Sequence, residues 1–377
     1  MKIHLFNPEH DIALAANLKN FTAPHAGRQL RYDMGYLPAL WASGDDRVAV
    51  DDEAEARRAL QRLAQNVARQ GGRLPADAVD RLVSIRKRSV MAAAGCVEPW
   101  GWDPALCALL LRRGVAPEVL PSDEAIEQMR QLSHRRTAAM VLRRLLATGH
   151  MLVGEACECD SVEAVEHYVG QHRHVVLKAP WSSSGRGLRF VDADGHGLSI
   201  HQGWLHGVLS AQGSVMAEPQ YNKVKDVGLE FESRPDGTVV CCGLSLFHTA
   251  NGAYTGNMLA TEGWKRQALA RYVPLSLLDS VQQLLCQVLA ETLAARYVGP
   301  LGVDMMIVAA APDASALQTS HAPFMLHPCV EINLRRTMGH VALWLVPLLN
   351  ARGDDDVVRV MRMTFAENHY KLTITRL

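Results

Sequence analysis

Two apolar stretches in the last third of the chain are each interrupted by acidic or amide side chains. GPLGVDMMIV contains Asp304, and CVEINLRRTMGH contains Glu331 and Asn333. Alternate residues of an extended strand share one face, so Glu331 and Asn333 project together, and burial of an unpaired carboxylate is costly. Two interpretations meet this constraint. Neighbouring strands could present these three side chains to one hard cation, or solvated strand faces could pair their acids with Arg335 or Arg336.

A lysine at the end of another apolar run is the second unusual feature. In VVLKAPWSSSGRGLRFV, Lys178 ends the run and a turn rich in Ser and Gly follows. Such a lysine can contact phosphate oxygens, and a turn without bulky side chains lets several backbone N–H groups converge on one anion. An exposed β-hairpin turn is an alternative explanation of the same residues, because Ser and Gly are common turn formers. The turn residues are Ser182, Ser183, Ser184, Gly185 and Gly187.

Composition excludes several classes of protein. The 377 residues are 48% hydrophobic, which is enough for a substantial core and favours two or three structural units. Lys and Arg (39) balance Asp and Glu (39), so we expect neither nucleic acid nor a membrane as a partner. No apolar run resembles a secretory or membrane-spanning segment, which predicts a cytoplasmic protein. The eight cysteines have no paired CxxC spacing, so we expect reduced thiols and no zinc site.

Local patterns predict an α/β start followed by an α+β region. KIHLF predicts a strand, and Asp103 with Pro104 predicts the start of a helix. Ser133 is a candidate cap for a helix that closes on Gly149. Further helices are expected over 53–72, 162–171 and 278–298, and strands in HVVLKAP, SVMAEP, VGLEFES, TVVCCGLSLFHT, GVDMMIV and CVEINL, with RPDG as a hairpin turn.

Over roughly residues 130–345 the chain resembles the ATP-grasp superfamily of carboxylate ligases. The resemblance is carried by the order and spacing of VVLKAPWSSSGRGL, VMAEPQ, GVDMM and EINLRR, the last of which is similar to that family's closing E-x-N-x-R metal motif. It implies an ATP-grasp fold behind an N-terminal Rossmann-like α/β domain. The implied domains are 1–125 (N-terminal α/β), 126–210 (lid subdomain) and 211–377 (C-terminal subdomain with the metal site).

The resemblance also implies roles for individual residues around the nucleotide phosphates. Lys178 matches the lysine that contacts the phosphates, and SSSGRG matches the flap that closes over them. The family's earlier lysine is missing, and Arg135 or Arg136 stands in its place. Asp304, Glu331 and Asn333 match the metal ligands. Arg335 matches the arginine that stabilises charge on the transferred phosphoryl group or on the acyl-phosphate.

On the nucleoside side, the resemblance places Glu218 at the hinge beside the adenine. The backbone of the next three residues, Pro219, Gln220 and Tyr221, would read the edge of the base. For the ribose, Asp226 and Glu230 are both candidates.

The implied activity is that of an ADP-forming carboxylate–amine ligase that uses ATP and Mg²⁺, with Mn²⁺ as an alternative. ATP would phosphorylate a carboxylate, and an amine of an amino acid, a peptide or a similar molecule would displace phosphate from the acyl-phosphate. The partners are therefore small-molecule or peptide substrates, and a homodimer is compatible with this activity. Two alternatives stay open: an ATP-grasp kinase or phosphotransferase, and a non-catalytic nucleotide-binding protein.

Three further segments are candidates for an acceptor site. Asn7, Glu9 and His10 follow the first strand, where open α/β sheets place ligands, but they could equally cap the next helix. SLFHTANGAYTGNML is polar and Gly-rich, and is either a substrate pocket or a long surface loop. In FTAPHAGRQLRYD, two arginines and a histidine suit an anionic substrate or form a solvated basic helix face. The candidate side chains of the second segment are His248, Asn251, Tyr254 and Asn257.

Overall fold

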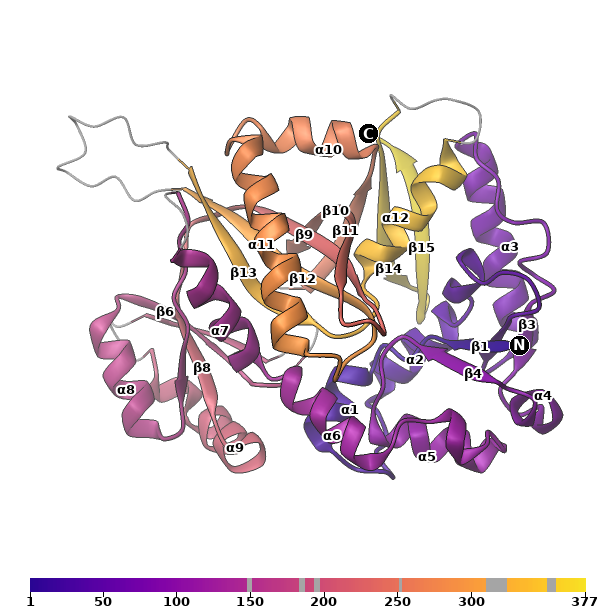
Figure 1. The fold of residues 1–377 in the computed structure, drawn as a ribbon, viewed down its shortest axis with the longest axis horizontal. Coiled ribbons are helices and arrows are strands. Elements are labelled where there is room, and N and C mark those ends of the chain that lie inside the picture. The colour runs from indigo at the N-terminus through magenta and orange to yellow at the C-terminus, as the bar shows by residue number, and fades with distance from the viewer. Residues whose placement is uncertain (148–150, 183–186, 193–196, 251–252, 310–323, 351–356) are drawn as a thin grey trace. The chain divides into compact units, whose positions relative to one another are not determined.

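The computed structural model of the chain forms two compact units (Figure 1). Unit 1 comprises residues 1–131, 255–264 and 335–377, and unit 2 comprises residues 132–254 and 265–334. The structure describes all residues except 148–150, 183–186, 193–196, 251–252, 310–323 and 351–356. The expected C-terminal subdomain, 211–377, is therefore divided between the two units.

Unit 1 begins with a four-stranded parallel sheet in the order β3-β2-β1-β4. Its strands are β1 (Lys2–Leu5), β2 (Arg47–Val50), β3 (Leu82–Ser84) and β4 (Cys96–Pro99). The helices of this part are α1 (His10–Ala16), α2 (His25–Met34), η1 (Leu37–Leu40), α3 (Glu53–Arg69), α4 (Arg88–Ala92), α5 (Pro104–Arg113), η2 (Pro117–Val119) and α6 (Asp123–Leu132). The parallel sheet with its helices confirms the predicted N-terminal α/β domain.

Local capping explains where the helices of unit 1 begin and end. Asp52 accepts a hydrogen bond from the Glu55 amide at 3.0 Å and starts α3. Asp103 caps α5 in the same way, accepting from the Leu106 amide at 2.9 Å with Pro104 in the first turn. Gly114 ends α5 with a φ of 98°, a left-handed conformation that favours glycine.

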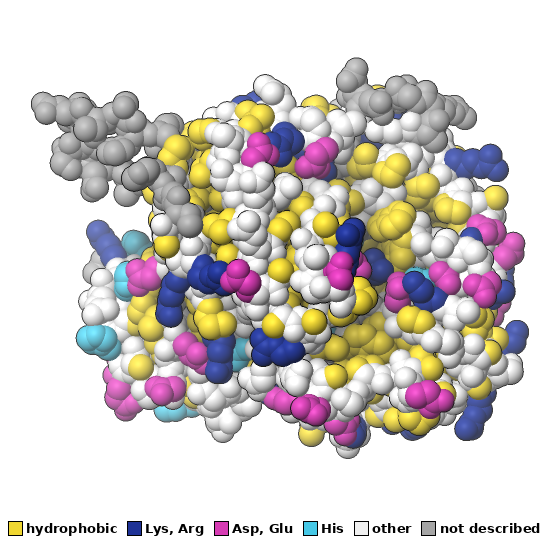
Figure 2. Space-filling model, in the orientation of Figure 1, with side chains coloured by type: hydrophobic (Ala, Val, Ile, Leu, Met, Phe, Trp, Pro, Cys, Tyr) yellow, Lys and Arg dark blue, Asp and Glu magenta, His cyan; other side chains and the backbone are white. Residues whose placement is uncertain are grey.

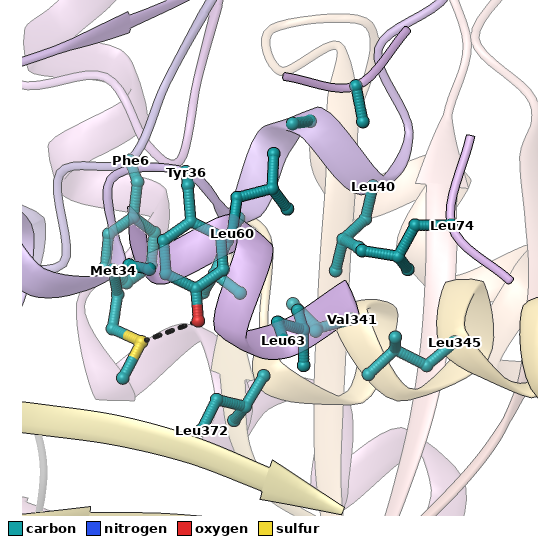
Figure 3. Close-up of a cluster of buried hydrophobic side chains, with 14 of the residues drawn as sticks. Phe6, Met34, Tyr36, Leu40, Leu60, Leu63, Leu74, Val341, Leu345 and Leu372 are labelled. Carbon is teal, nitrogen blue, oxygen red and sulfur yellow. Dashed lines mark hydrogen bonds between the residues drawn. The ribbon is translucent and has the colours of Figure 1, made fainter. Parts of the chain in front are cut away.

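The C-terminal part of the chain completes the core of unit 1. It supplies α12 (Met338–Leu349) and the antiparallel hairpin of β14 (Arg359–Ala366) and β15 (His369–Arg376). In the buried cluster of Figure 3, Leu60 of α3 lies with Val341 of α12 and Leu372 of β15. Residues some 300 positions apart in the sequence therefore bury one apolar surface together, which is the physical reason that 335–377 belongs to unit 1.

Unit 2 contains a small antiparallel sheet in the order β5-β8-β6-β7. Its strands are β5 (Cys157–Cys159), β6 (His174–Lys178), β7 (Leu188–Asp192) and β8 (Val215–Pro219), and its helices are α8 (Val162–Gln171), η3 (Ser199–His201) and α9 (Gln202–Gln212). Both α8 and α9 contact β8. Val165, Leu177 and Leu205 are fully buried in the core between helices and sheet.

Long antiparallel strands build the rest of unit 2, in the order β13-β12-β9-β10. They are β9 (Lys223–Ser233), β10 (Val239–Ala250), β12 (Gly299–Ala309) and β13 (Phe324–Asn333). The turn between β9 and β10 contains Gly237 with a φ of 82°, which confirms the expected RPDG hairpin. Helix α7 (Arg135–Leu146) packs on β13, and α11 (Leu275–Leu293) packs on α7 and β10.

Two expectations about local structure were wrong. Ser133 does not cap α7: the N-cap is His134, whose ring accepts a hydrogen bond from the Arg136 amide, while the expected stop at Gly149 lies outside the described residues. SLFHTANGAYTGNML is not a long loop, because His248 lies within β10, which ends at Ala250, and the later part of the segment forms β11 (Ala253–Leu259), which precedes α10 (Glu262–Leu269). Its aromatic and β-branched residues favour strands, which its glycines had obscured.

The surface agrees with the balanced composition. On the face drawn in Figure 2, basic and acidic side chains are interspersed, with no field of a single sign. All eight cysteines are free thiols. Among the described helices, none combines the length and the apolar character needed to cross a membrane.

Gly256 in β11 tests how tightly the C-terminal strands are packed. A Cβ at this position would lie 2.2 Å from the carbonyl oxygen of Met361 in β14, so Gly256→Ala forces the two strands apart. We expect the free energy of unfolding to fall by about 1–3 kcal/mol, measured by thermal denaturation followed by circular dichroism. Gly263→Ala is the matched control, because nothing lies within 4 Å of its added methyl group. Equal stability of the two variants would contradict this packing.

Candidate nucleotide and metal site

Lys178 is buried and bound to a carboxylate. It ends β6, beside β8, which carries Glu218, and its Nζ lies 2.5 Å from Glu218 Oε2. Each residue is only 6% exposed. Burial of either charge alone would be costly, so Glu218 compensates the Lys178 ammonium group at the end of this strand. The sequence predicted both residues as site residues, and their contact depends on the alignment of β6 with β8.

Asp304, Glu331 and Asn333 lie together on the paired strands β12 and β13. Asp304 is opposite Glu331 in the register, and Asn333 donates an amide hydrogen bond to Asp304 Oδ2 at 3.2 Å. The register shifts just beyond this pair, between Asp304 and Met306, and such irregularities redirect side chains. In the described part of the chain no group of three His, Cys, Asp or Glu side chains is placed to hold a metal ion, and the third ligand predicted from the sequence, Asn333, carries an amide.

Arg135 links the lysine strand to these carboxylates. At the first position of α7, its Nη1 lies 2.9 Å from Glu331 Oε2 and its Nε donates to the Ala179 carbonyl at 3.0 Å. Its Nη2 donates to Ser182 Oγ at 3.2 Å. Arg136 is exposed and instead contacts Glu158 at 3.0 Å. Of the two arginines that could replace the missing lysine, Arg135 is therefore the one beside the predicted site.

The ends of the predicted flap are close together. The Ala179 amide donates to the Gly187 carbonyl at 2.9 Å. A Cβ on Gly187 would lie 2.3 Å from Ser182 Oγ, so this close approach requires glycine. Ser183, Ser184 and Gly185 lie outside the described residues.

The predicted hinge begins at the end of β8 with Glu218 and Pro219. The Gln220 amide donates to the His174 carbonyl at 2.9 Å. Burial raises the pKa of Tyr221 to about 12, so its hydroxyl stays protonated. The two ribose candidates differ: Asp226 accepts from Lys223 at 2.9 Å and from Thr249 at 2.8 Å, while Glu230 is 3% exposed in the interior of β9.

His327 is a polar residue of this region that the sequence analysis missed. It lies on β13, its ring 5.5 Å edge-on from that of Tyr221. The side chain is 1% exposed, and neither ring nitrogen has a hydrogen-bond partner among the described residues. Burial, with a smaller effect of the Lys178 charge, lowers its pKa to about 3, so the imidazole is neutral. The one signal in the sequence was a histidine inside an apolar strand, four residues before Glu331.

Arg335 belongs to unit 1, although it directly follows the last residue of unit 2. Its Nε lies 3.0 Å from Asp11 Oδ1 and its Nη2 lies 2.9 Å from Asp11 Oδ2. This two-bond geometry is a strong way to hold a guanidinium. The residue predicted to act on the phosphoryl group is therefore bound to a carboxylate of α1 in this structure.

The structure brings the first set of acceptor candidates together inside unit 1. Asn7 donates to the Gly101 carbonyl at 2.8 Å and to Asp103 Oδ2 at 3.1 Å. His10 Nδ1 lies 3.8 Å from the same carboxylate, and Glu9 pairs with Arg31. Among the described residues no side chain caps α1, so this part of the capping interpretation is wrong, although Asp11 does place a negative charge in the first turn.

The second set of acceptor candidates is not gathered in one loop. His248 is exposed near the end of β10, and Tyr254 lies on β11 in unit 2. Asn257, also on β11, is fully buried and belongs to unit 1, while Asn251 lies outside the described residues. The structure therefore gives no support to the prediction that these side chains line one pocket.

Protein-family models give no match to the chain, and neither do curated protein sequences. Among solved structures, the chain is similar to N5-carboxyaminoimidazole synthetase from Staphylococcus aureus complexed with ADP, at 11% identity and a TM-score of 0.46 over 97% of this chain and 83% of that one. It is similar to biotin carboxylase from Campylobacter jejuni at 13% identity and a TM-score of 0.49, over 96% and 75% of the two chains. The chain is also similar to the biotin carboxylase domain of 2-oxoglutarate carboxylase from Hydrogenobacter thermophilus. The identity is 13% and the TM-score is 0.44, over 74% of this chain and 60% of that one.

The buried Lys178–Glu218 pair makes a testable prediction about stability. Lys178→Met leaves the Glu218 carboxylate buried without its counter-charge, which should lower the free energy of unfolding by about 3–5 kcal/mol. Adding Glu218→Gln should restore at least half of that loss, because no uncompensated charge remains. Thermal unfolding of the single and double variants measures both effects.

Arg144→Gln provides the control, since it removes an exposed ion pair with Glu291 and should change the stability by at most about 1 kcal/mol. Strictly additive effects of Lys178→Met and Glu218→Gln would show that the two charges do not compensate each other.

Proposed function

We propose that the chain is a Mg²⁺-dependent ligase that uses ATP to join a carboxylate to an amine, and forms ADP. The observation that carries this proposal is the set of contacts of Arg135, which bind the lysine strand and the start of the flap to Glu331. These contacts bring the cations that we propose to bind phosphate close to the carboxylates that we propose to bind metal, an arrangement that transfer of a phosphoryl group requires. The resemblance of the motifs to ATP-grasp ligases supports the same activity.

Lys178 and Arg135 would bind the phosphates of ATP. Each already carries its charge beside a carboxylate, Glu218 or Glu331 respectively. Phosphate oxygens would replace or share these partners, so the two cations need not be brought in from solvent when nucleotide arrives. This arrangement supplies positive charge in fixed positions, which lowers the reorganisation required during the reaction.

The residues of β12 and β13 fit a magnesium ion. Two carboxylates and an amide offer only oxygen ligands, the set that Mg²⁺ prefers, and the small number of protein ligands leaves room for phosphates. Asp304, Glu331 and Asn333 would hold the ion, with the Asn333 amide turned to present its oxygen. Mg²⁺ would neutralise charge on the phosphates and so favour attack at phosphorus.

His327 and Tyr221 would contact the base of the nucleotide. The backbone after Glu218 matches the segment that reads adenine in the family, and the Tyr221 ring touches that of His327. Buried polar atoms are almost always hydrogen-bonded, and the two ring nitrogens of His327 have no partner among the described residues. A base edge, with both donors and acceptors, would satisfy them.

The proposed reaction has two steps. A carboxylate oxygen of the first substrate attacks the γ-phosphorus of ATP, the bond to the bridging oxygen breaks, and ADP leaves. The amine nitrogen then attacks the acyl carbon, phosphate leaves, and the nitrogen loses a proton to form the amide. Lys178 and Arg135 would counter the negative charge during the first step, where two anions approach each other.

Glu331→Gln tests the metal role of this carboxylate. The variant keeps the shape of the side chain but loses its charge, so we expect ATP turnover to fall at least about 100-fold and the Mg²⁺ concentration for half-maximal rate to rise. Turnover is measured as phosphate release from ATP with mixtures of amino acids and dipeptides, and mass spectrometry identifies the product.

Glu291→Gln, an exposed carboxylate of α11, is the control and should behave as the wild type. Near-normal turnover by Glu331→Gln would refute the site. A phosphorylated product without an amide would show that the protein is a phosphotransferase and not a ligase. Nucleotide binding without turnover in any mixture would show that it is a non-catalytic binding protein.

A further inference from the structure

Unit 1 contains a cavity of about 400 Å³ that none of the proposed reaction steps uses. It lies at the carboxyl ends of β2 and β3, where Asp51 and Asp52 follow one strand and Ile85 and Arg86 follow the other. Open α/β sheets place ligands at this edge, and the volume suits a small molecule. Helices α2 and α5 complete the lining with Arg31, Tyr32, Leu109 and Arg113.

One of the three guanidinium groups of this cavity is already neutralised. Arg31 forms an ion pair with Glu9, which is 8% exposed, and its Nε donates to Asp51 Oδ2 at 2.9 Å. Two carboxylates therefore share this one arginine. It contributes to the shape of the wall, and it brings no unmatched positive charge to a ligand.

The other two guanidinium groups have no such partner. Neither Arg86 nor Arg113 forms an ion pair or a side-chain hydrogen bond with any residue that the structure describes. The Nε atom of Arg113, at the end of α5, is buried and has no hydrogen-bond partner within the described part of the chain. An unsatisfied buried donor is unfavourable, and a planar oxyanion is the group that a guanidinium binds best.

The same cavity presents negative charge with remaining acceptor capacity. Asp51 uses one oxygen for Arg31. Asp52 accepts from the Glu55 amide at 3.0 Å and from the Tyr32 hydroxyl at 3.4 Å. An ionised carboxylate has about four acceptor sites, so both residues can also bind a cationic donor.

Charge balance selects the class of ligand. The lining carries three guanidinium groups and the carboxylates of Asp51 and Asp52, and Glu9 pairs with Arg31 beside it, so groups of both signs are present and separated. A phosphate would be repelled by the two aspartates, and a simple cation by the unpaired arginines. A zwitterion satisfies both groups at once.

We propose that this cavity binds a free α-amino acid. Its carboxylate would lie on Arg86 and Arg113, its ammonium on Asp51 and Asp52, and its side chain against the apolar wall of Ile85 and Leu109. The proposal rests on unit 1 alone and does not depend on the proposed ligase reaction, because binding is measured without ATP.

The test uses the full chain in the absence of nucleotide. Each of the twenty L-amino acids, and inorganic phosphate as a comparison, is screened for a concentration-dependent rise in the unfolding temperature, and dissociation constants are then measured by calorimetry. We expect at least one amino acid to bind, and its N-acetyl derivative to bind at least about tenfold less tightly, since acetylation removes the ammonium charge.

Arg86→Gln and Arg113→Gln locate the binding. Each variant should weaken binding of that amino acid at least about tenfold, while Arg112→Gln, which alters the exposed neighbour on α5, should not change it. Arg86 is exposed, so its variant keeps the fold even where that of Arg113 does not. Absence of binding by all twenty amino acids, preference for phosphate, or wild-type affinity in Arg86→Gln would overturn the proposal.

Discussion

The ion pair of Arg135 with Glu331 is the interaction on which the arrangement of the unit 2 site depends. It ties the start of α7 to β13, and the same guanidinium reaches the Ala179 carbonyl at the end of the lysine strand. Burial of an uncompensated charge is costly, and the site contains a second such pair in the buried Lys178 and Glu218. In the absence of ligand, Arg135 and Lys178 are thus each paired with a carboxylate. When a polyphosphate and its metal bind, the phosphates would take the place of the carboxylates beside the two cations, and the metal would take the place of the cations beside the carboxylates.

The sequence predicted those parts of the site that depend on local pattern. Lys178, Asp304 and Glu331 stand out because each interrupts an apolar strand, and the alternation of β13 places Asn333 on the face of Glu331. The α/β character of unit 1 was likewise predictable from the KIHLF strand, the helix expected over 53–72 and the helix start at Asp103 and Pro104. In each case the signal lies within about twenty residues of chain.

The remaining features depend on contacts between distant segments. Arg135 and Arg136 are adjacent, so only the packing of α7 on β13 decides which of them meets Glu331. Residues 335–377 join unit 1 because α12 and β15 share its core, and nothing in their local sequence indicates this. His327 is a candidate site residue because it is buried and its ring nitrogens have no partner among the described residues. The sequence pattern around a single histidine does not predict such burial.

We propose that unit 2 binds a nucleotide together with magnesium, and calorimetric titration with ADP tests this binding most directly. The wild-type chain should bind one ADP per chain, more tightly with Mg²⁺ than with a chelator present, because metal and phosphates share the charges of one site. Binding should weaken at least about tenfold in Arg135→Gln, which loses one cation but leaves the metal ligands. No heat of binding at ADP and Mg²⁺ concentrations of about 1 mM, the upper range of ordinary enzyme substrates, would contradict the account.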